Sequence, residues 1–161
     1  MPTVIVAIDL GSTTGWAANP DGVVTSGTLT FRPGRFEGGG MRFVRFRAAM
    51  SELISQTGAT RVYFEEVHSH GVKSKNGKQI TPIDAAHLYG GFLAHLTALC
   101  EEMRIPYLGV PVGTIKKHAT GKGNANKDAM KAAATARGWT FSDDNEADAL
   151  WILDWAKEHA T

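Results

Sequence analysis

Near the start of the chain, a carboxylate stands where an apolar strand ends. Asp9 follows an apolar run at 4–8 and precedes a turn of small residues that includes Gly11 and Gly15. Charge at the end of a buried strand costs free energy unless a cation or a bound phosphate compensates it. The pattern therefore predicts a metal or phosphate site. The alternative is an ordinary turn or helix-cap aspartate.

Two further carboxylates favour a metal. Glu65 closes a second apolar strand, and Asp148 lies in the last helical segment, on a face that also carries Trp151 and Trp155. That face should pack against the protein body, where Asp148 would need a partner. Clustered carboxylate oxygens suit Mg²⁺ or Mn²⁺. Two such ions ~3.5–4 Å apart can clamp the attacking and leaving oxygens of a phosphodiester hydrolysis.

Lysines gather in two segments that could bind nucleic acid. The formal net charge of +1 gives no overall basic signal, so such a surface depends on local clusters. One cluster flanks a glycine-rich turn at 120–126, and the other lies in a polar stretch at 68–78. The candidate DNA-binding lysines are Lys73, Lys75, Lys116, Lys117, Lys122 and Lys127. Solvated surface lysines are the alternative interpretation.

Length and composition indicate an ordinary globular protein. The 161 residues, 43% hydrophobic and 20% charged, fit a single domain spanning 1–161 with a sizeable core. Cys100 is the only cysteine, which excludes an intrachain disulfide and favours a reducing cytoplasm. No apolar run approaches the ~18 residues of a membrane span, and no export signal opens the sequence. We therefore expect a cytoplasmic protein with no membrane partner.

Apolar periodicity predicts an α/β fold. Strands are expected at 3–10, 15–18, 23–31, 60–66 and 105–112. Helices are expected at 43–58, 81–103, 114–119, 127–137 and 144–158. The stretch at 68–78 is too polar for either period and is predicted to be an exposed mobile loop. Three antiparallel strands followed by two parallel ones match a ribonuclease-H-like mixed five-stranded sheet flanked by helices.

Four ordered motifs resemble RuvC-type Holliday junction resolvases, in particular the short forms carried by bacteriophages. The motifs lie at 8–15, 64–67, 115–127 and 145–150. The resemblance implies a homodimeric endonuclease that resolves four-way or other branched DNA junctions, with two Mg²⁺ or Mn²⁺ ions in each active site. It assigns Asp9, Glu65 and Asp148 as catalytic metal ligands. It also places Lys116 and Lys127 against the DNA backbone.

Two positions depart from the family pattern. Asn145 stands where the family usually has an acidic residue or a histidine, three positions before the final aspartate. Asp144 is four positions before Asp148, on about the same helical face, so either Asp144 or Asn145 is expected to complete the site. His68 stands where bacterial members place an aromatic that wedges into the junction. Histidine can stack on a base or contact phosphate, and a surface loop histidine is the alternative.

Three other functions remain open. A ribonuclease-H-like nuclease acting on RNA–DNA hybrids or flaps would share the fold and the metal chemistry. A junction-binding protein with weakened catalysis would explain the uncharged Asn145. The turn after Asp9 also resembles the phosphate-binding turn of sugar kinases, actin and Hsp70-type ATPases, but those proteins need two related domains, and the chain is too short for both.

Overall fold

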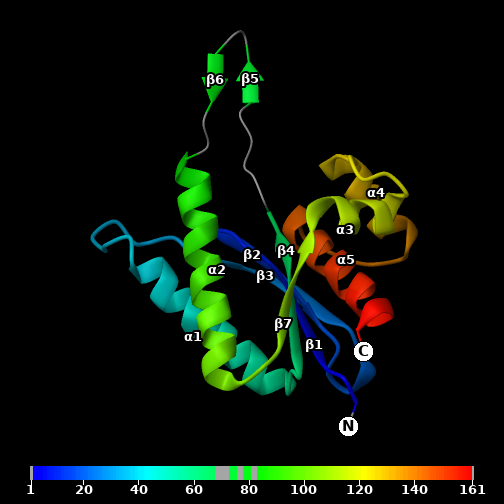
Figure 1. Ribbon diagram of the computed structural model, residues 1–161, viewed down its shortest axis with the longest axis horizontal. Coiled ribbons are helices and arrows are strands. Elements are labelled where there is room, and N and C mark those ends of the chain that lie inside the picture. The colour runs from blue at the N-terminus through cyan, green and yellow to red at the C-terminus, as the bar shows by residue number, and fades with distance from the viewer. Residues whose placement is uncertain (1, 68–72, 76–77, 81–82, 161) are drawn as a thin grey trace.

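The fold is built on a mixed sheet with the strand order β3-β2-β1-β4-β7 (Figure 1). The structure, a computed structural model, describes residues 2–67, 73–75, 78–80 and 83–160. β1 pairs antiparallel with β2, and β2 with β3, whereas β4 is parallel to both β1 and β7. The strands are β1 (Ile5–Asp9), β2 (Thr13–Ala18), β3 (Thr25–Thr30), β4 (Arg61–Glu66) and β7 (Tyr107–Pro111). The predicted sheet is therefore confirmed.

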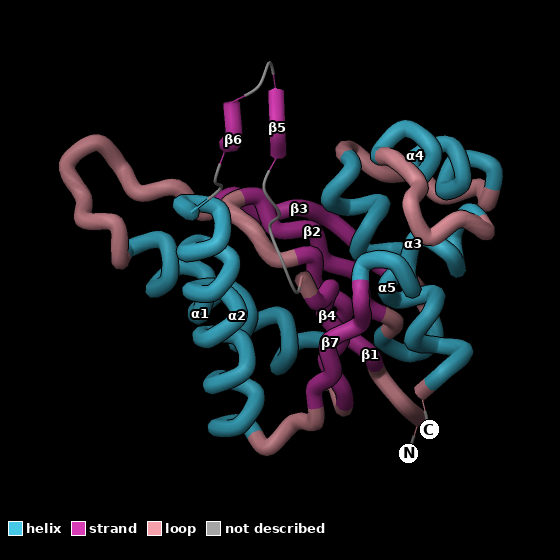
Figure 2. Tube along the Cα trace, turned by 45° about the horizontal axis from the view of Figure 1, so that its top comes forward, coloured by secondary structure: helices cyan, strands magenta, loops and turns pink. Residues whose placement is uncertain are grey.

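Helices cover both faces of this sheet (Figure 2). α1 (Met41–Thr57) and α2 (Ile83–Met103) pack on one face. The other face carries α3 (Val112–Thr120), α4 (Lys127–Ala136) and α5 (Asp144–His159), and a short 3₁₀ helix, η1 (Pro20–Gly22), precedes β3. The bounds of the predicted strands and helices are correct to within two residues. None of the helices in the described part of the chain is long and apolar enough to cross a membrane.

Alternation along β1 decides which way its last residue points. Ile5 and Ala7 lie in the core beneath α5, whereas Val6 and Ile8 lie in the core beneath α1 and α2. Successive side chains of a strand point to opposite faces of the sheet. Asp9 is therefore directed to the α5 side, where charge at the strand end meets the first turns of that helix.

The polar stretch after β4 contains a small two-stranded sheet. β5 (Lys73–Lys75) and β6 (Lys78–Ile80) pair antiparallel, with Lys75 opposite Lys78. The prediction of a loop is wrong for these residues, because a short hairpin without a core of its own shows no apolar alternation. Asn76-Gly77 is the sequence signal that favours such a hairpin.

Candidate active site

Asp9 and Glu65 meet at the end of two adjacent parallel strands. The register pairs Ile8 of β1 with Phe64 of β4, so the two acidic residues that follow lie side by side. Tyr63 packs in the core on the α5 side, and two residues later Glu65 points the same way. The two carboxyl groups share a hydrogen bond. Two strand ends thus place two carboxyls on the α5 face.

Asp148 reaches these carboxyls from α5. Its helix packs across β1, β2 and β4 and buries Ala147, Ala149 and Trp151 around it. The pKa of Asp148 is raised to about 7, first by burial and then by the charges of Glu65 and Asp144. Negative charge from three elements therefore accumulates at one point.

The other two carboxyls show the same electrostatic conflict. Burial raises the pKa of Asp9 well above its ordinary value, and the charges of Glu65 and Asp148 raise it further. Burial also raises the pKa of Glu65, although its hydrogen bond with Asp9 and the charge of Lys116 act in the opposite direction. The nearby lysines are thus insufficient to neutralise the cluster.

These side chains line a cavity of about 280 Å³. Its lining residues are Asp9, Glu65, Val112, Lys116, Lys127, Met130, Asp144, Asn145 and Asp148. Among these described residues the potential ligands are carboxylate and amide oxygens, with no thiol or imidazole. Hard oxygen donors with surplus negative charge fit Mg²⁺ or Mn²⁺.

Two of the candidate lysines reach this cavity. Lys116 lies on α3, which is capped by Gly121 in the left-handed conformation (φ +83°). Lys127 is the first residue of α4, directly after the helix cap Asn126, whose side chain accepts a hydrogen bond from the Ala129 N–H. The predicted turn between the two helices thus brings both lysines to the carboxylates.

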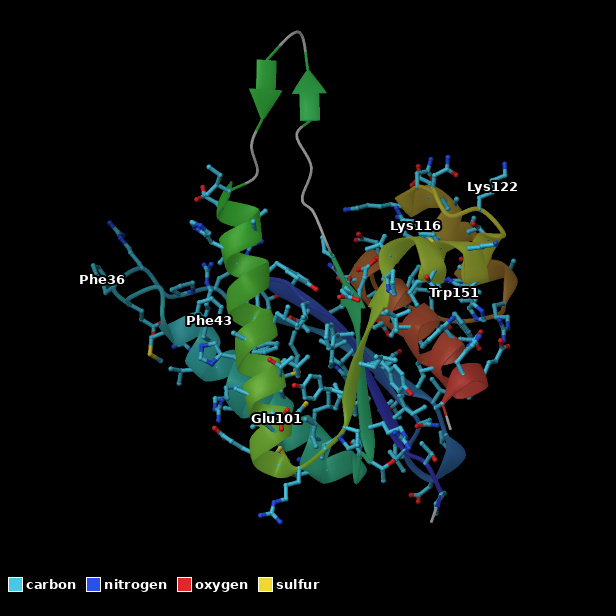
Figure 3. The ribbon with its side chains drawn as sticks, viewed as in Figure 1. Phe36, Phe43, Glu101, Lys116, Lys122 and Trp151 are labelled. Carbon is cyan, nitrogen blue, oxygen red and sulfur yellow. The ribbon has the colours of Figure 1, made fainter. Side chains whose placement is uncertain are left out.

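The remaining candidates lie elsewhere. Lys117 and Lys122 are exposed and do not line the cavity. Lys73 and Lys75 belong to β5, but their side chains lie outside the described part of the chain, as does His68. Figure 3 labels Lys116 and Lys122 at the upper right, over the region of α3 and α4.

Both candidates for the additional ligand lie at the cavity. Asp144 and Asn145 are the first two residues of α5. The Asp144 carboxylate lies 3.3 Å from the Nζ of Lys127, whose side chain is 81% exposed. Asp144 therefore faces a cation that can move away, whereas Asn145 offers a neutral oxygen.

Glu146 anchors the start of α5, a role that sequence reasoning missed. Its carboxylate accepts hydrogen bonds from the Ser26 hydroxyl of β3 (2.6 Å) and from the Ser142 N–H and hydroxyl (both 2.9 Å). Burial acts to raise its pKa, but these hydrogen bonds prevail and lower it. The available signal was the capping pattern Asp143-x-x-Glu146, in which Asp143 accepts from the Glu146 N–H (2.9 Å).

Tyr89 of α2 is a second residue that sequence reasoning missed. Its hydroxyl donates to the Glu65 carbonyl oxygen (2.8 Å) and accepts from the Val67 N–H (3.1 Å). These bonds fix the backbone on both sides of the strand end. A tyrosine on a predicted amphipathic helix gave no sequence signal for this contact.

Gly15 lets α5 approach the sheet. It lies opposite Asp9 in the β1–β2 register, and a Cβ at this position would overlap the backbone carbonyl of Asn145. The glycine in the first motif is thus needed for close packing of the helix that carries Asp148.

Gly15→Ala is expected to lower the free energy of unfolding by about 1–3 kcal/mol, because the first turn of α5 must move. Cleavage activity should fall as well, since Asp144, Asn145 and Asp148 move with that turn. Chemical denaturation checks the first effect. Gly90→Ala in α2 is the control, since a Cβ there meets open space. Equal stability of Gly15→Ala and wild type would contradict the packing argument.

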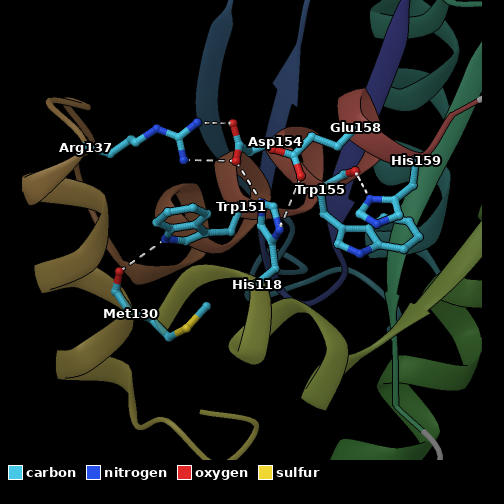
Figure 4. A network of polar contacts seen from close by, with 8 residues as sticks. All are labelled: His118, Met130, Arg137, Trp151, Asp154, Trp155, Glu158 and His159. Carbon is cyan, nitrogen blue, oxygen red and sulfur yellow. Dashed lines mark hydrogen bonds and ion pairs between the residues drawn. The ribbon is translucent and has the colours of Figure 1, made fainter. Parts of the chain in front are cut away.

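A polar network between α3, the end of α4 and α5 holds α3 and α4, which carry Lys116 and Lys127, against α5 (Figure 4). Nε2 of His118 lies 2.8 Å from Oδ2 of Asp154. Arg137, just after α4, donates to both oxygens of Asp154 (3.1 and 2.9 Å). Glu158 completes a group that could hold a metal by distance alone, but the bonds from Arg137 and His118 already occupy Asp154. The network therefore connects α3 and α4 to α5.

Comparisons with known proteins identify the fold. No family model and no curated protein matches the sequence. Among solved structures, Thermus thermophilus RuvC matches with a TM-score of 0.70 at 19% identity, over 99% of this chain and 98% of that chain. The T. thermophilus RuvC complex with a Holliday junction substrate matches with a TM-score of 0.68 at 19% identity, over 94% and 90%.

A third neighbour comes from a eukaryote. The yeast mitochondrial Holliday junction resolvase Ydc2 matches with a TM-score of 0.60 at 12% identity, over 92% of this chain and 75% of that chain. The bacteriophage-like form stays a prediction. The predicted resemblance is confirmed at the level of the fold: this chain has the fold of RuvC-type Holliday junction resolvases.

Proposed function

We propose that this protein is a metal-dependent endonuclease that resolves four-way or other branched DNA junctions. The observation that carries the proposal is the convergence of Asp9, Glu65, Asp148 and two lysines on one cavity. A neighbour of the same fold is described in complex with a Holliday junction substrate, which supports branched DNA as the ligand. The activity would be that of a crossover junction endodeoxyribonuclease.

Asp9, Glu65 and Asp148 would hold Mg²⁺ or Mn²⁺, with two ions expected in each site. When bound, such ions activate water for attack on a phosphodiester and stabilise charge on the leaving oxygen. Because the pKa values of Asp9 and Glu65 are both raised, both groups would have to be ionised before they can act as ligands. The raised pKa values thus describe a site prepared for cations.

The lysines would hold the DNA backbone. Lys116 and Lys127 offer point charges to phosphates at the cavity. Lys127 can exchange Asp144 for a phosphate oxygen, because its side chain is largely in solvent. We propose that Lys117, Lys122, Lys73 and Lys75 also contact DNA, and that His68 stacks on a base or contacts phosphate at the junction, as its place in the family pattern implies.

A homodimer fits the symmetry of the substrate. Two nicks related by the two-fold symmetry of a four-way junction need two active sites in the same relation, which a symmetric dimer provides. The proposal of a dimer rests on the family resemblance.

A panel of labelled substrates tests this function. We expect cleavage of four-way junctions with Mg²⁺ or Mn²⁺, no cleavage in a chelator, and much slower cleavage of matched duplex. Preferred cleavage of RNA–DNA hybrids or flaps would favour the other nuclease function. Junction binding without cleavage at any metal concentration would favour a binding protein, and tight ATP binding by calorimetry would favour the phosphate-binding alternative.

The additional ligand is decided by comparing Asp144→Asn with Asn145→Ala. The ligand variant should need a higher metal concentration for half-maximal cleavage, by about 10-fold or more, as expected when a metal's coordination is weakened. The other variant should keep the wild-type metal dependence. Metal titrations of junction cleavage make the measurement. Unchanged curves for both variants would remove both residues from the metal site.

A further inference from the structure

The loop at 31–40 leaves the sheet at the same edge as the carboxylates. β3 runs in the same direction as β1, because both are antiparallel to β2. The ends of β1, β3 and β4 therefore lie along one edge of the sheet. Figure 3 places Phe36 on one side of the molecule and Lys122 on the other. DNA held at the carboxylates and extending along this edge would meet the loop.

The tip of this loop presents an aromatic ring to solvent. The Phe36 side chain is 94% exposed, the highest value among the exposed large apolar residues of the described chain. The guanidinium of Arg35 lies 5.4 Å from the centre of the ring. A single exposed apolar side chain is common on protein surfaces. Phe36 differs from such residues because it lies beside a cation on a loop that hydrogen bonds hold in place.

Hydrogen bonds brace the loop below its tip. The Gly34 N–H donates to the Glu37 carboxylate (2.6 Å), and the Glu37 N–H donates to the Gly34 carbonyl oxygen (3.0 Å). Arg45 of α1 donates to the same carboxylate (2.8 Å). The tip is therefore preorganised, which reduces the entropy lost when it binds a ligand.

The base of the loop is fixed in the core. Phe31 is buried against Phe46 and Phe92, with ring centres 5.5 and 6.4 Å apart. Its N–H donates to the Ser12 carbonyl oxygen (2.6 Å), in the turn that follows Asp9. The tip and the carboxylate site are thus anchored to the same turn.

The loop and the start of α1 carry a local positive charge. Residues 32–47 contain five arginines and one acidic residue, Glu37. Arg45 and Arg47 pair with Glu37 and Glu102. Arg32 and Arg35 are exposed, and neither forms an ion pair within the described part of the chain. Arg35 thus lies beside the ring, and Arg32 precedes it in the same loop, each without an ion pair among the described residues.

We propose that this tip is a second DNA-binding element, in which Phe36 stacks on an unpaired base and Arg32 and Arg35 contact the neighbouring phosphates. One ring and two cations are too small for a stable protein interface, which buries ~800 Å² on each partner, but they match one nucleotide. Bases inside a duplex are already stacked, so the base must come from a branch point or a single strand. The inference rests on the proposed function, because DNA at the carboxylates brings the branch to this edge.

The test measures binding in a chelator, so that no substrate is cut. The labelled probes are a four-way junction, a splayed-arm duplex, a single strand and a matched duplex. Phe36→Ala should weaken binding to the first three by about fivefold or more, the loss expected for one base–aromatic stack, and leave duplex binding within about twofold. Phe36→Trp should restore affinity. Leu108→Ala, which removes a 52% exposed apolar side chain from β7, is the matched control.

Salt dependence separates stacking from charge. Arg35→Ala should reduce the slope of log affinity against log salt by about one for every probe, because one phosphate contact is lost. Phe36→Ala should leave that slope unchanged. Equal losses on duplex and unpaired probes, or no loss from Phe36→Ala, would overturn the inference. A difference in sedimentation mass between Phe36→Ala and wild type would also overturn the inference, since the tip would then be a protein interface.

The wild-type protein distinguishes failure of this inference from failure of the proposed function. If wild type cuts junctions and Phe36→Ala binds every probe as tightly as wild type does, only the inference fails. If wild type cuts no junction but binds single strands through Phe36, the tip is a DNA-binding element and the proposed function fails.

Discussion

Asp9→Asn should reduce the rate of four-way junction cleavage by at least about 10³-fold and leave junction binding in a chelator largely intact. The residue lies at the centre of the carboxylate cluster, where Glu65 and Asp148 both act on its charge. Loss of one charged ligand removes several kcal/mol of transition-state stabilisation, and each 1.36 kcal/mol changes the rate about tenfold. Single-turnover cleavage with saturating protein measures the rate without the effect of binding.

Glu65→Gln and Asp148→Asn should behave in the same way, since each removes a carboxylate from the same cavity. Asp128→Asn is the matched control, because this acid is exposed in the first turn of α4 and does not line the cavity. The control should cut at the wild-type rate. Full activity of any of the three cavity variants would contradict the assignment of that residue.

The parts of the site that sequence predicts are those set by burial within one element. The apolar run at 4–8 predicts that Asp9 ends a buried strand, although a run that is apolar at every position does not decide to which face Asp9 points. Trp151, at helical spacing from Asp148, fixes the inward face of α5. Both inferences need only the local period of the chain and its apolar residues.

The choice between neighbouring lysines is not a local property. Lys116 lines the cavity and Lys117 does not, although both belong to the same cluster in the sequence. Adjacent residues of a helix point about 100° apart, and the rotation of α3 is set by its contacts with α5, including the bond from His118 to Asp154. Those contacts join residues far apart in the sequence, and no single segment encodes them.

The sequence likewise does not predict which distant segments approach each other closely. Gly15 reads as part of a turn, but its neighbour is the backbone of Asn145, on the last helix. The position of the Phe36 loop at the edge that carries the carboxylates depends on the direction of β3, which follows only when the pairing of three strands is known. Sequence therefore predicts the residues of the site better than the residues that support it.

Without divalent metal, the protein should become less stable as the pH rises from about 5 to about 7.5. The pKa of Asp148 is about 7 in the folded protein, against an ordinary value of 3.8. Between these values the folded protein holds a proton that the unfolded chain has released, so the free energy of unfolding falls with rising pH. Asp9 and Glu65, whose pKa values are also raised, contribute with the same sign.

Asp148→Asn should therefore stabilise the metal-free protein at pH 8 by on the order of 2–4 kcal/mol and flatten the pH dependence. Mg²⁺ should raise the Tm of wild type more than that of the variant, because the cation neutralises the charge that destabilises the folded state. Thermal unfolding in a chelator and in Mg²⁺, at pH values from 5 to 8, makes the measurement.

Glu146→Gln, also on α5, should change the stability at pH 8 in the direction opposite to Asp148→Asn. The pKa of Glu146 is lowered by its hydrogen bonds from Ser26 and Ser142, after burial has acted to raise it. Its charge therefore stabilises the folded protein at neutral pH and loses that effect on acidification. The variant should be less stable than wild type at pH 8, by about 1–3 kcal/mol.

A lower Tm for Asp148→Asn than for wild type in a chelator at pH 8 would mean that the cavity stabilises the apoprotein. The carboxylates would then stabilise the folded protein, as Glu146 does. The proposed cation site would lose its support, because that support is the repulsion among these carboxylates.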